Sequence, residues 1–127
     1  MRRAALAAAT LAGCATISSA APAATTTAAS TAAPARLLVE GREFNLTLSR
    51  QKVRAGRIIV QLANRGEDPH DLRIVRIRGR RAGSIAETRP GEVGEWEGRL
   101  RTGRYRLYCA LEGHRALGMK ATLRAAR

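Results

Sequence analysis

The sequence predicts an all-β domain, a sandwich of about seven to eight strands, preceded by a signal peptide and a flexible linker. Three observations lead to this prediction. Short apolar segments alternate with polar residues, turn residues separate these segments at short intervals, and the first 35 residues differ in composition from the rest. The chain has 127 residues, which suits one folded domain at most.

The N-terminus has the features of an export signal. A short basic stretch, Met1-Arg2-Arg3, precedes the apolar segment from Ala4 to Gly13, which is too short to persist as a transmembrane helix. Leu11-Ala12-Gly13-Cys14 resembles a bacterial lipobox, so we expect residues 1–13 to be removed and Cys14 to be lipidated. Ala21-Pro22-Ala23 offers ordinary signal peptidase a competing site. Cleavage there would leave a soluble periplasmic or secreted protein.

The segment after the signal is predicted to be a tether. Residues 15–35 consist mainly of Ala, Thr, Ser and Pro, carry no charge and have no apolar periodicity. We therefore expect residues 14–35 to be disordered and residues 36–127 to form the folded domain, anchored to the membrane by its lipid at the periplasmic side or the cell surface.

The first half of the domain contains three predicted strands. Apolar and polar residues alternate over 44–48, and a turn at 55–56 introduces the apolar run 58–63. A second turn at 64–66 leads to residues 72–77, which are β-branched and rich in arginine. Short strands separated by frequent turns are typical of a β-sandwich.

The second half is less regular. Residues 80–94 are compatible with a short helix or a long loop, and the sequence does not decide between them. A short strand is predicted over 96–100, followed by a turn at 102–103. Residues 105, 107 and 109 then share one face of a strand, and residues 119, 121 and 123 share one face of the last strand.

The charge is strongly basic, with a formal net charge of +13. Such a charge suits nucleic acid, anionic surfaces or an acidic partner, but the export signal argues against nucleic acid. Residues 73–81 contain five of the arginines. This segment is either a patch for an acidic partner or anionic lipid, or an ordinary solvated strand and loop.

A cluster of metal-binding residue types lies near the C-terminus. Cys109, His114 and Met119 follow one another with the spacing C-x4-H-x4-M, in a loop between two predicted strands, and His70 opens an earlier strand. The domain has no other histidine, cysteine or methionine. A thiolate with a thioether suits copper(I), imidazole suits both copper states, and zinc seldom recruits methionine. The set therefore predicts an electron-transfer copper site, whereas each residue alone would be an ordinary core or turn residue.

These segments resemble the blue copper proteins, or cupredoxins, a family that includes azurin, plastocyanin, rusticyanin and the phytocyanins. The resemblance extends from the ligand loop to the strand from Gly103 to Cys109 and to the segment from Val53 to Ile74. It implies a Greek-key β-sandwich with one type 1 copper at one end, held equatorially by His70, Cys109 and His114 and axially by Met119.

Two positions depart from the pattern of this family. Asp71 follows the first histidine, where the family usually has Asn, and Ala110 follows the cysteine, where it usually has Ser or Thr. The side-chain hydrogen bond that usually ties the two loops cannot form between these residues. We expect Asp71 either to point into solvent or to replace that bond by accepting backbone N–H groups of the Cys109 loop.

The function expected from the resemblance is one-electron transfer by a monomer, through the exposed edge of His114, to an acidic redox partner. Leu111, Ala116 and Leu117 would form an apolar docking surface around this edge. Two alternatives remain open at this point: a module for copper delivery or storage, and a metal-free adhesion sandwich. An enzyme is not expected, because four protein ligands leave no open position for a substrate. The donor and the acceptor cannot be identified from the sequence.

Overall fold

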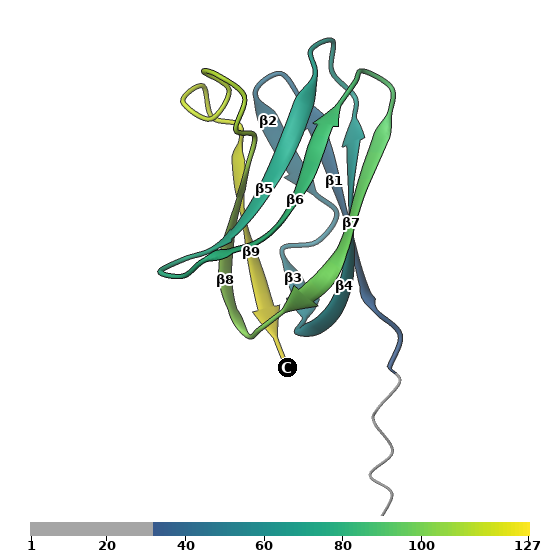
Figure 1. Ribbon diagram of the computed structural model, residues 1–127, viewed down its shortest axis with the longest axis vertical. Helices are drawn as coiled ribbons and strands as arrows, with labels where there is room; N and C mark the ends of the chain where they lie inside the picture. Colours follow the sequence, from purple (N-terminus) through teal and green to yellow (C-terminus); the bar gives the residue numbers. More distant parts are fainter. Residues whose placement is uncertain (1–31) are drawn as a thin grey trace, which may run out of the picture. The chain divides into compact units, whose positions relative to one another are not determined.

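The computed structural model describes residues 32–127, which fold into nine β-strands arranged as two packed sheets (Figure 1). In chain order the strands are β1 (Ala35–Arg42), β2 (Asn45–Leu48), β3 (Lys52–Arg54), β4 (Gly56–Asn64), β5 (His70–Arg76), β6 (Arg81–Thr88), β7 (Val93–Leu100), β8 (Gly103–Tyr108) and β9 (Lys120–Ala126). Residues 32–127 contain no helix, and therefore no helix that could cross a membrane. The predicted signal peptide, the expected lipidation site Cys14 and most of the predicted tether lie outside the described residues.

Both sheets are mixed in strand direction. The first has the order β2-β1-β4-β7 and the second the order β3-β9-β8-β5-β6. The pairs β1–β4 and β3–β9 are parallel, and the other pairs are antiparallel. Parallel neighbours require crossover connections between the sheets, which is why the chain passes repeatedly from one sheet to the other.

The core lies between the sheets, and buried side chains alternate with more exposed ones along most of its strands. Leu37, Val39, Ile58, Val60 and Leu62 face inward from the first sheet with at most 1% of their surface exposed. From the second sheet come Leu72, Ile74, Tyr105, Leu107 and Leu123. The one polar atom of the Tyr105 side chain is satisfied, because its hydroxyl donates to the Arg101 carbonyl at 2.7 Å.

Residues 80–94 form neither of the two structures that the sequence suggested. They form β6, a tight turn and the start of β7, which raises the strand count to nine. The strand was hidden because β6 has few large apolar side chains. Its Gly83 lies against the ring of Trp96, on β7 of the other sheet, so that even a β-carbon at this position would collide with the indole. The Trp96 ring on β7 thus covers the part of β6 that has no large apolar side chain of its own.

Strands β1 and β3 were also not predicted. β3 has only three residues, and β1 starts at Ala35, one residue before the predicted start of the domain. The long loop between β8 and β9 lies at the same end of the sandwich as the connection from β4 to β5 (Figure 1). This end therefore collects the residues that the sequence marked as metal ligands.

Candidate metal centre

Three of the four predicted ligands stand at strand ends. His70 is the first residue of β5, Cys109 follows the last residue of β8, and Met119 precedes the first residue of β9. All three are fully buried, whereas His114 lies in the loop between β8 and β9 and is half-buried. Strand ends have fixed backbone directions, so the sheet determines where these three side chains point.

The loop that carries His114 is closed by backbone hydrogen bonds. Cys109 N–H donates to the Met119 carbonyl at 3.2 Å, and Met119 N–H donates to the His114 carbonyl at 3.1 Å. Gly113 and Gly118 have φ angles of 77° and 111°, which favour glycine. The loop is thus a folded element of its own that fixes the spacing of Cys109, His114 and Met119.

The two histidines and the cysteine converge. One ligand atom of each of His70, Cys109 and His114 lies within 4.8 Å of the others. The Sγ atom of Cys109 is 3.5 Å from Nδ1 of His114, and the two imidazole rings meet edge to face with their centroids 5.3 Å apart. The geometry brings together residues that are 44 positions apart in the sequence.

Met119 approaches the same space. A β-carbon placed on Gly41 of β1 would lie 3.3 Å from Cδ2 of His70 and 3.4 Å from Cε of Met119. Both side chains therefore border the volume that Gly41 leaves free. Gly41 is buried and was not singled out from the sequence, because a glycine in a strand gives no local signal of what packs on it.

The residues present fit a copper ion. Neither ring nitrogen of the fully buried His70 has a hydrogen-bond partner among residues 32–127, and a buried polar atom without a partner is costly unless a ligand satisfies it. Burial lowers the pKa of His70, so its ring is neutral and free to coordinate. Burial also raises the pKa of the Cys109 thiol, so metal binding must displace its proton.

Glu43 is a neighbour of the site that the sequence did not reveal. It lies in the turn between β1 and β2, and its Oε1 is 3.4 Å from Nε2 of His70. The same oxygen accepts backbone N–H groups from Glu67 at 2.6 Å and Asp68 at 2.9 Å. Glu43 accepts hydrogen bonds from backbone N–H groups, and these lower its pKa to about 2, with the largest effect from Asp68. With Nε2 turned toward this carboxylate, Nδ1 is the nitrogen of His70 left for a metal.

Asp71 points inward and ties two loops together. Its side chain is almost fully buried, Oδ1 accepts the Ala110 backbone N–H at 2.6 Å, and Oδ2 lies 3.1 Å from the Arg73 guanidinium. The expectation that this carboxylate would point into solvent is wrong. The carboxylate instead joins β5 to the residue that follows Cys109, as the alternative expectation proposed.

A second polar anchor stabilises the approach to His70. The buried Asn64 side chain donates to the carbonyls of Asp68 and Thr88, at 2.8 and 2.9 Å, and accepts the Gly66 N–H at 2.9 Å. The sequence suggested only a turn at this position. The residues that bond to Asn64 are up to 24 positions away, so only the fold reveals the role of this side chain.

The rim around His114 is partly apolar. Leu117 is 62% exposed, Ala116 is exposed and Leu111 is half-buried. Phe44 packs edge to face on the His114 ring with the centroids 5.2 Å apart. The half-buried imidazole is thus held between Phe44, His70 and the loop, and part of its surface remains open.

Comparisons with known proteins were made by sequence and by structure. No family model and no curated protein matches the chain by sequence. By structure, the auracyanin of Roseiflexus castenholzii has a TM-score of 0.62 at 19% identity, with 72% of this chain and 97% of that chain covered. Auracyanin A, described as a "blue" copper protein of Chloroflexus aurantiacus, has a TM-score of 0.56 at 13% identity, with 72% and 99% covered.

A copper-containing nitrite reductase of Thermus scotoductus also matches, with a TM-score of 0.51 and 18% identity. The match covers 72% of this chain but only 30% of that enzyme, so it shows a shared domain fold and not a shared activity. The sandwich, the convergence of two imidazoles and one thiol, and these neighbours agree with the resemblance predicted from the sequence and with one type 1 copper. The described chain has the cupredoxin fold, which is the fold of the blue copper proteins.

Proposed function

We propose that this protein transfers single electrons through one copper ion bound by His70, Cys109 and His114, with Met119 as a weak axial ligand. The observation that carries the proposal is the convergence of two imidazoles and one thiol within 4.8 Å at the end of the sandwich. When bound there, copper supplies a one-electron couple between its 1+ and 2+ states. The protein's part is to hold the donors in place, exclude water from Cys109 and leave His114 as the contact with the surface.

Rigidity favours electron transfer over copper delivery or storage. Three of the four proposed ligands are fully buried, and the loop from Cys109 to Met119 is closed by its own backbone hydrogen bonds. A site that keeps its geometry in both states suits electron transfer, whereas release of copper to another protein would require this loop to open. The same closed ligand set argues against an enzyme, since it leaves no position for a substrate.

The test is to add copper(II) to metal-free protein expressed from the full-length sequence and to record visible absorption and electron spin resonance. Because the thiolate is the chromophore, Cys109→Ser should abolish an intense absorption toward the red, and Cys14→Ser should leave it unchanged. A Cys109→Ser variant that stays coloured would refute the ligand assignment. Met119→Leu should retain copper with a raised reduction potential, because it removes a donor that helps the oxidised state.

Two further measurements separate the alternatives. Reversible voltammetry without transfer of copper to a metal-free acceptor protein supports electron transfer, and rapid transfer supports delivery. Absence of copper binding at neutral pH would leave the adhesion sandwich. The redox partner meets the protein at the half-buried edge of His114.

We also propose that the protein is exported and held at the membrane by lipid on Cys14. The supporting observation is the lipobox-like sequence before that cysteine. Full-length protein should enter the detergent phase in a phase-partition experiment, and Cys14→Ser should stay in the aqueous phase. A mature N-terminus at Ala24, found by mass spectrometry, would contradict lipidation and support a secreted form.

A further inference from the structure

On β3, β8 and β9 the outer face of the second sheet carries only positive charge, and exposed acidic side chains lie beyond these strands, at Glu87 on the edge strand β6 and at Glu112 in the loop after β8. β3, β8 and β9 contain no aspartate or glutamate, and the only acidic residue of the adjoining β5 is the buried Asp71. Six exposed side chains cover this area and are called the basic face: Lys52, Arg104, Arg106, Arg115, Lys120 and Arg124. Within residues 32–127 none of the six forms an ion pair, although other arginines of the domain do.

The register of the sheet stacks these charges against one another. Arg124 is the Cα partner of Arg104 on one side and of Lys52 on the other, so three cations occupy one row across three strands. Like charges directly opposite each other in a sheet are destabilising. The first sheet also places two arginines opposite each other, Arg57 and Arg99, but there Glu97 contacts Arg57 at 2.7 Å and offsets the repulsion. A row of three cations without an ion pair costs stability, which suggests a functional role for the face that carries it.

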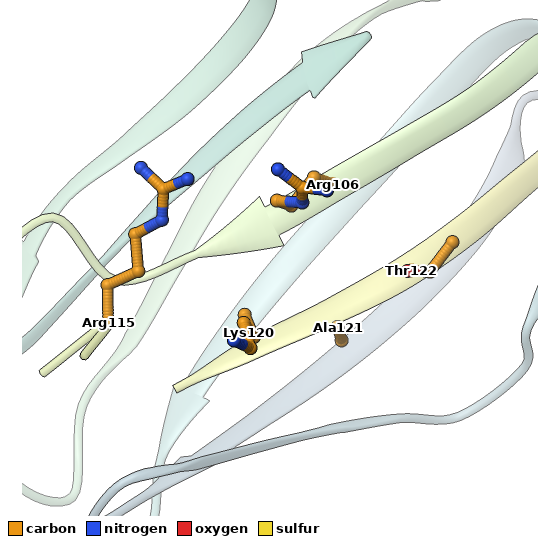
Figure 2. A pocket seen from close by; sticks show the side chains of 5 residues that line it. All are labelled: Arg106, Arg115, Lys120, Ala121 and Thr122. Atoms are coloured by element: carbon orange, nitrogen blue, oxygen red, sulfur yellow. The ribbon is translucent and has the colours of Figure 1, made fainter. Parts of the chain in front are cut away.

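The basic face reaches the loop that carries His114. Arg115, the next residue along, lies over the ring of Tyr108 with its guanidinium carbon 4.4 Å from the ring centroid. Together with Arg106 and Lys120 it borders a surface hollow of about 330 Å³ that Ala121 and Thr122 complete. Figure 2 shows these side chains on two neighbouring strands and the adjacent loop. No acidic residue lines the hollow.

A second hollow, of about 540 Å³, extends the charged region. Arg106 and Arg115 border it as well, and Arg76 at the end of β5 and Arg78 in the β5–β6 connection add two more cations. Part of the five-arginine segment noted in the sequence therefore joins the basic face. Recesses lined by guanidinium groups fit protruding carboxylate side chains, because guanidinium binds carboxylate through two parallel hydrogen bonds.

We propose that the basic face is the docking surface for an acidic protein partner, which covers it together with the exposed tip of the His114 loop. That this acidic protein is the redox partner rests on the proposed function. The existence of a docking surface does not depend on that proposal. A protein fits better than a lipid bilayer for two reasons. The surface is hollowed where its cations gather, and Arg115 and Lys120 also border a hollow lined by Leu111 and Ala116 of the apolar rim and by Glu112, so the basic face continues into the rim that an electron-exchange partner would contact.

The experiment uses metal-free protein expressed from the full-length sequence and a short poly-L-glutamate peptide as the probe. Titration at low salt, followed by backbone amide chemical shifts, should perturb β8, β9 and residues 110–118 and leave the outer face of β1 and β7 unchanged. The pair Arg106→Glu and Lys120→Glu should weaken binding by about tenfold or more. The pair Arg36→Glu and Arg99→Glu is a matched control that makes the same change in net charge on exposed positions of the first sheet, and it should weaken binding less than about twofold.

Three results would overturn the proposal. These are equal losses in the two double variants, shifts centred on the first sheet, or tighter binding of the Cys14→Ser protein, which cannot carry the proposed lipid, to phosphatidylglycerol vesicles than to the peptide, which would assign the face to lipid. If the charge-reversed pair does not fold, the pair Arg106→Gln and Lys120→Gln replaces it, with Arg36→Gln and Arg99→Gln as its control.

A kinetic measurement on copper-loaded protein keeps the two proposals separate. The second-order rate of electron exchange with anionic hexacyanoferrate should fall severalfold in the charge-reversed pair, and that with a cationic cobalt complex should rise. If copper-loaded protein exchanges no electrons but the peptide still perturbs the basic face, the proposed function is refuted and the docking surface stands. If the exchange rates are the same in the variant and the wild type and the peptide does not perturb the basic face, the docking surface alone is refuted.

Discussion

The Asp71 side chain replaces the side-chain hydrogen bond between two loops that is usual in the blue copper family. Its carboxylate is held between the Ala110 N–H and the Arg73 guanidinium, so it joins two strands across the end of the sheet. A hydrogen bond from a backbone N–H to a charged acceptor is stronger than one between neutral groups. Asp71, although it departs from the family pattern, thus connects the two loops through a hydrogen bond to the backbone instead of to a side chain.

Removal of the Asp71 carboxylate should loosen the Cys109 loop. Asp71→Ala leaves the Ala110 N–H without its acceptor, and we expect it to destabilise the fold by roughly 1–3 kcal/mol and to speed copper loss. Asp71→Asn keeps an acceptor and should retain copper, with the reduction potential raised because a negative charge near the site is lost. Urea unfolding, copper release to a chelator and voltammetry measure these effects. An Asp71→Ala variant with wild-type copper retention would show that the loop is held by other contacts.

Glu43 should set both the orientation and the electron density of His70. Its carboxylate faces Nε2, which favours the tautomer with the proton on Nε2 and the lone pair on Nδ1. Glu43→Gln keeps an acceptor but removes the charge, so it should preserve that tautomer in the metal-free protein and raise the reduction potential of the copper form by some tens of millivolts. Nitrogen chemical shifts of the imidazole report the tautomer, and voltammetry reports the potential.

The exposed Glu67 provides a matched control for Glu43. Glu67 lies in the β4–β5 connection, where its backbone N–H donates to Glu43, and Glu67→Gln removes the same charge without removing the carboxylate that faces His70, so its effect on the potential should be smaller. Equal shifts in the two variants would mean that only the overall charge matters. A metal-free protein with the proton on Nδ1 of His70 would contradict the orientation inferred from Glu43.

At the scale of the strands, Trp96 closes one edge of the sandwich. Its indole occupies the space above Gly83 on β6 and Gly98 on its own strand, so a side chain at either glycine would collide with the ring. The contact joins the edge strands of the two sheets, β6 and β7. The Trp96 ring thus explains why glycine stands at both positions, although glycine weakens a strand.

Gly83→Ala should destabilise the domain although alanine is ordinarily the better strand residue. The displaced indole should cost roughly 1–3 kcal/mol, more than the gain from restricting the unfolded chain. In a Trp96→Ala background the same substitution should cost little, because the obstacle is gone. Urea unfolding of the four proteins tests this coupling, and additive effects would show that Gly83 and Trp96 act independently. Ser84→Ala on the same strand serves as a control.

For the molecule as a whole, metal binding and folding are linked. The sandwich buries His70 without hydrogen-bond partners among residues 32–127 and buries the Cys109 thiol, so the metal-free state retains a cost that copper relieves. Anything that binds the folded state alone stabilises it by mass action. The site is therefore both the functional centre and a contributor to stability.

Copper should raise the midpoint of thermal unfolding by about 10 °C or more when its concentration exceeds the dissociation constant by about a hundredfold. Because burial raises the pKa of the Cys109 thiol, the metal-free protein keeps that proton at neutral pH, and binding must release it. The apparent affinity should therefore increase as the pH rises toward that pKa. Scanning calorimetry measures both effects. A Cys109→Ser variant with the same increase in the unfolding midpoint would locate the stabilising metal elsewhere.

The sequence by itself determined the features that depend on local order. The alternation of residues along β2, β8 and β9 predicted the fold class, since side chains of a strand alternate between its faces. The spacing of Cys109, His114 and Met119 gave the candidate ligands, because the three occupy one loop. These signals lie within about ten residues of each other, and nothing in the rest of the fold is needed to see them.

Only the tertiary structure decided the features that depend on which strands become neighbours. Glu43 reaches His70 from another turn, and Gly41 leaves the space that His70 and Met119 border. The basic face arises because β3, β9 and β8 lie side by side, which places Lys52 in the row of Arg124 and Arg104. The physical reason is the same in each case: a sheet pairs segments that are distant in the chain, and the pairing register, which no local pattern encodes, decides which side chains meet.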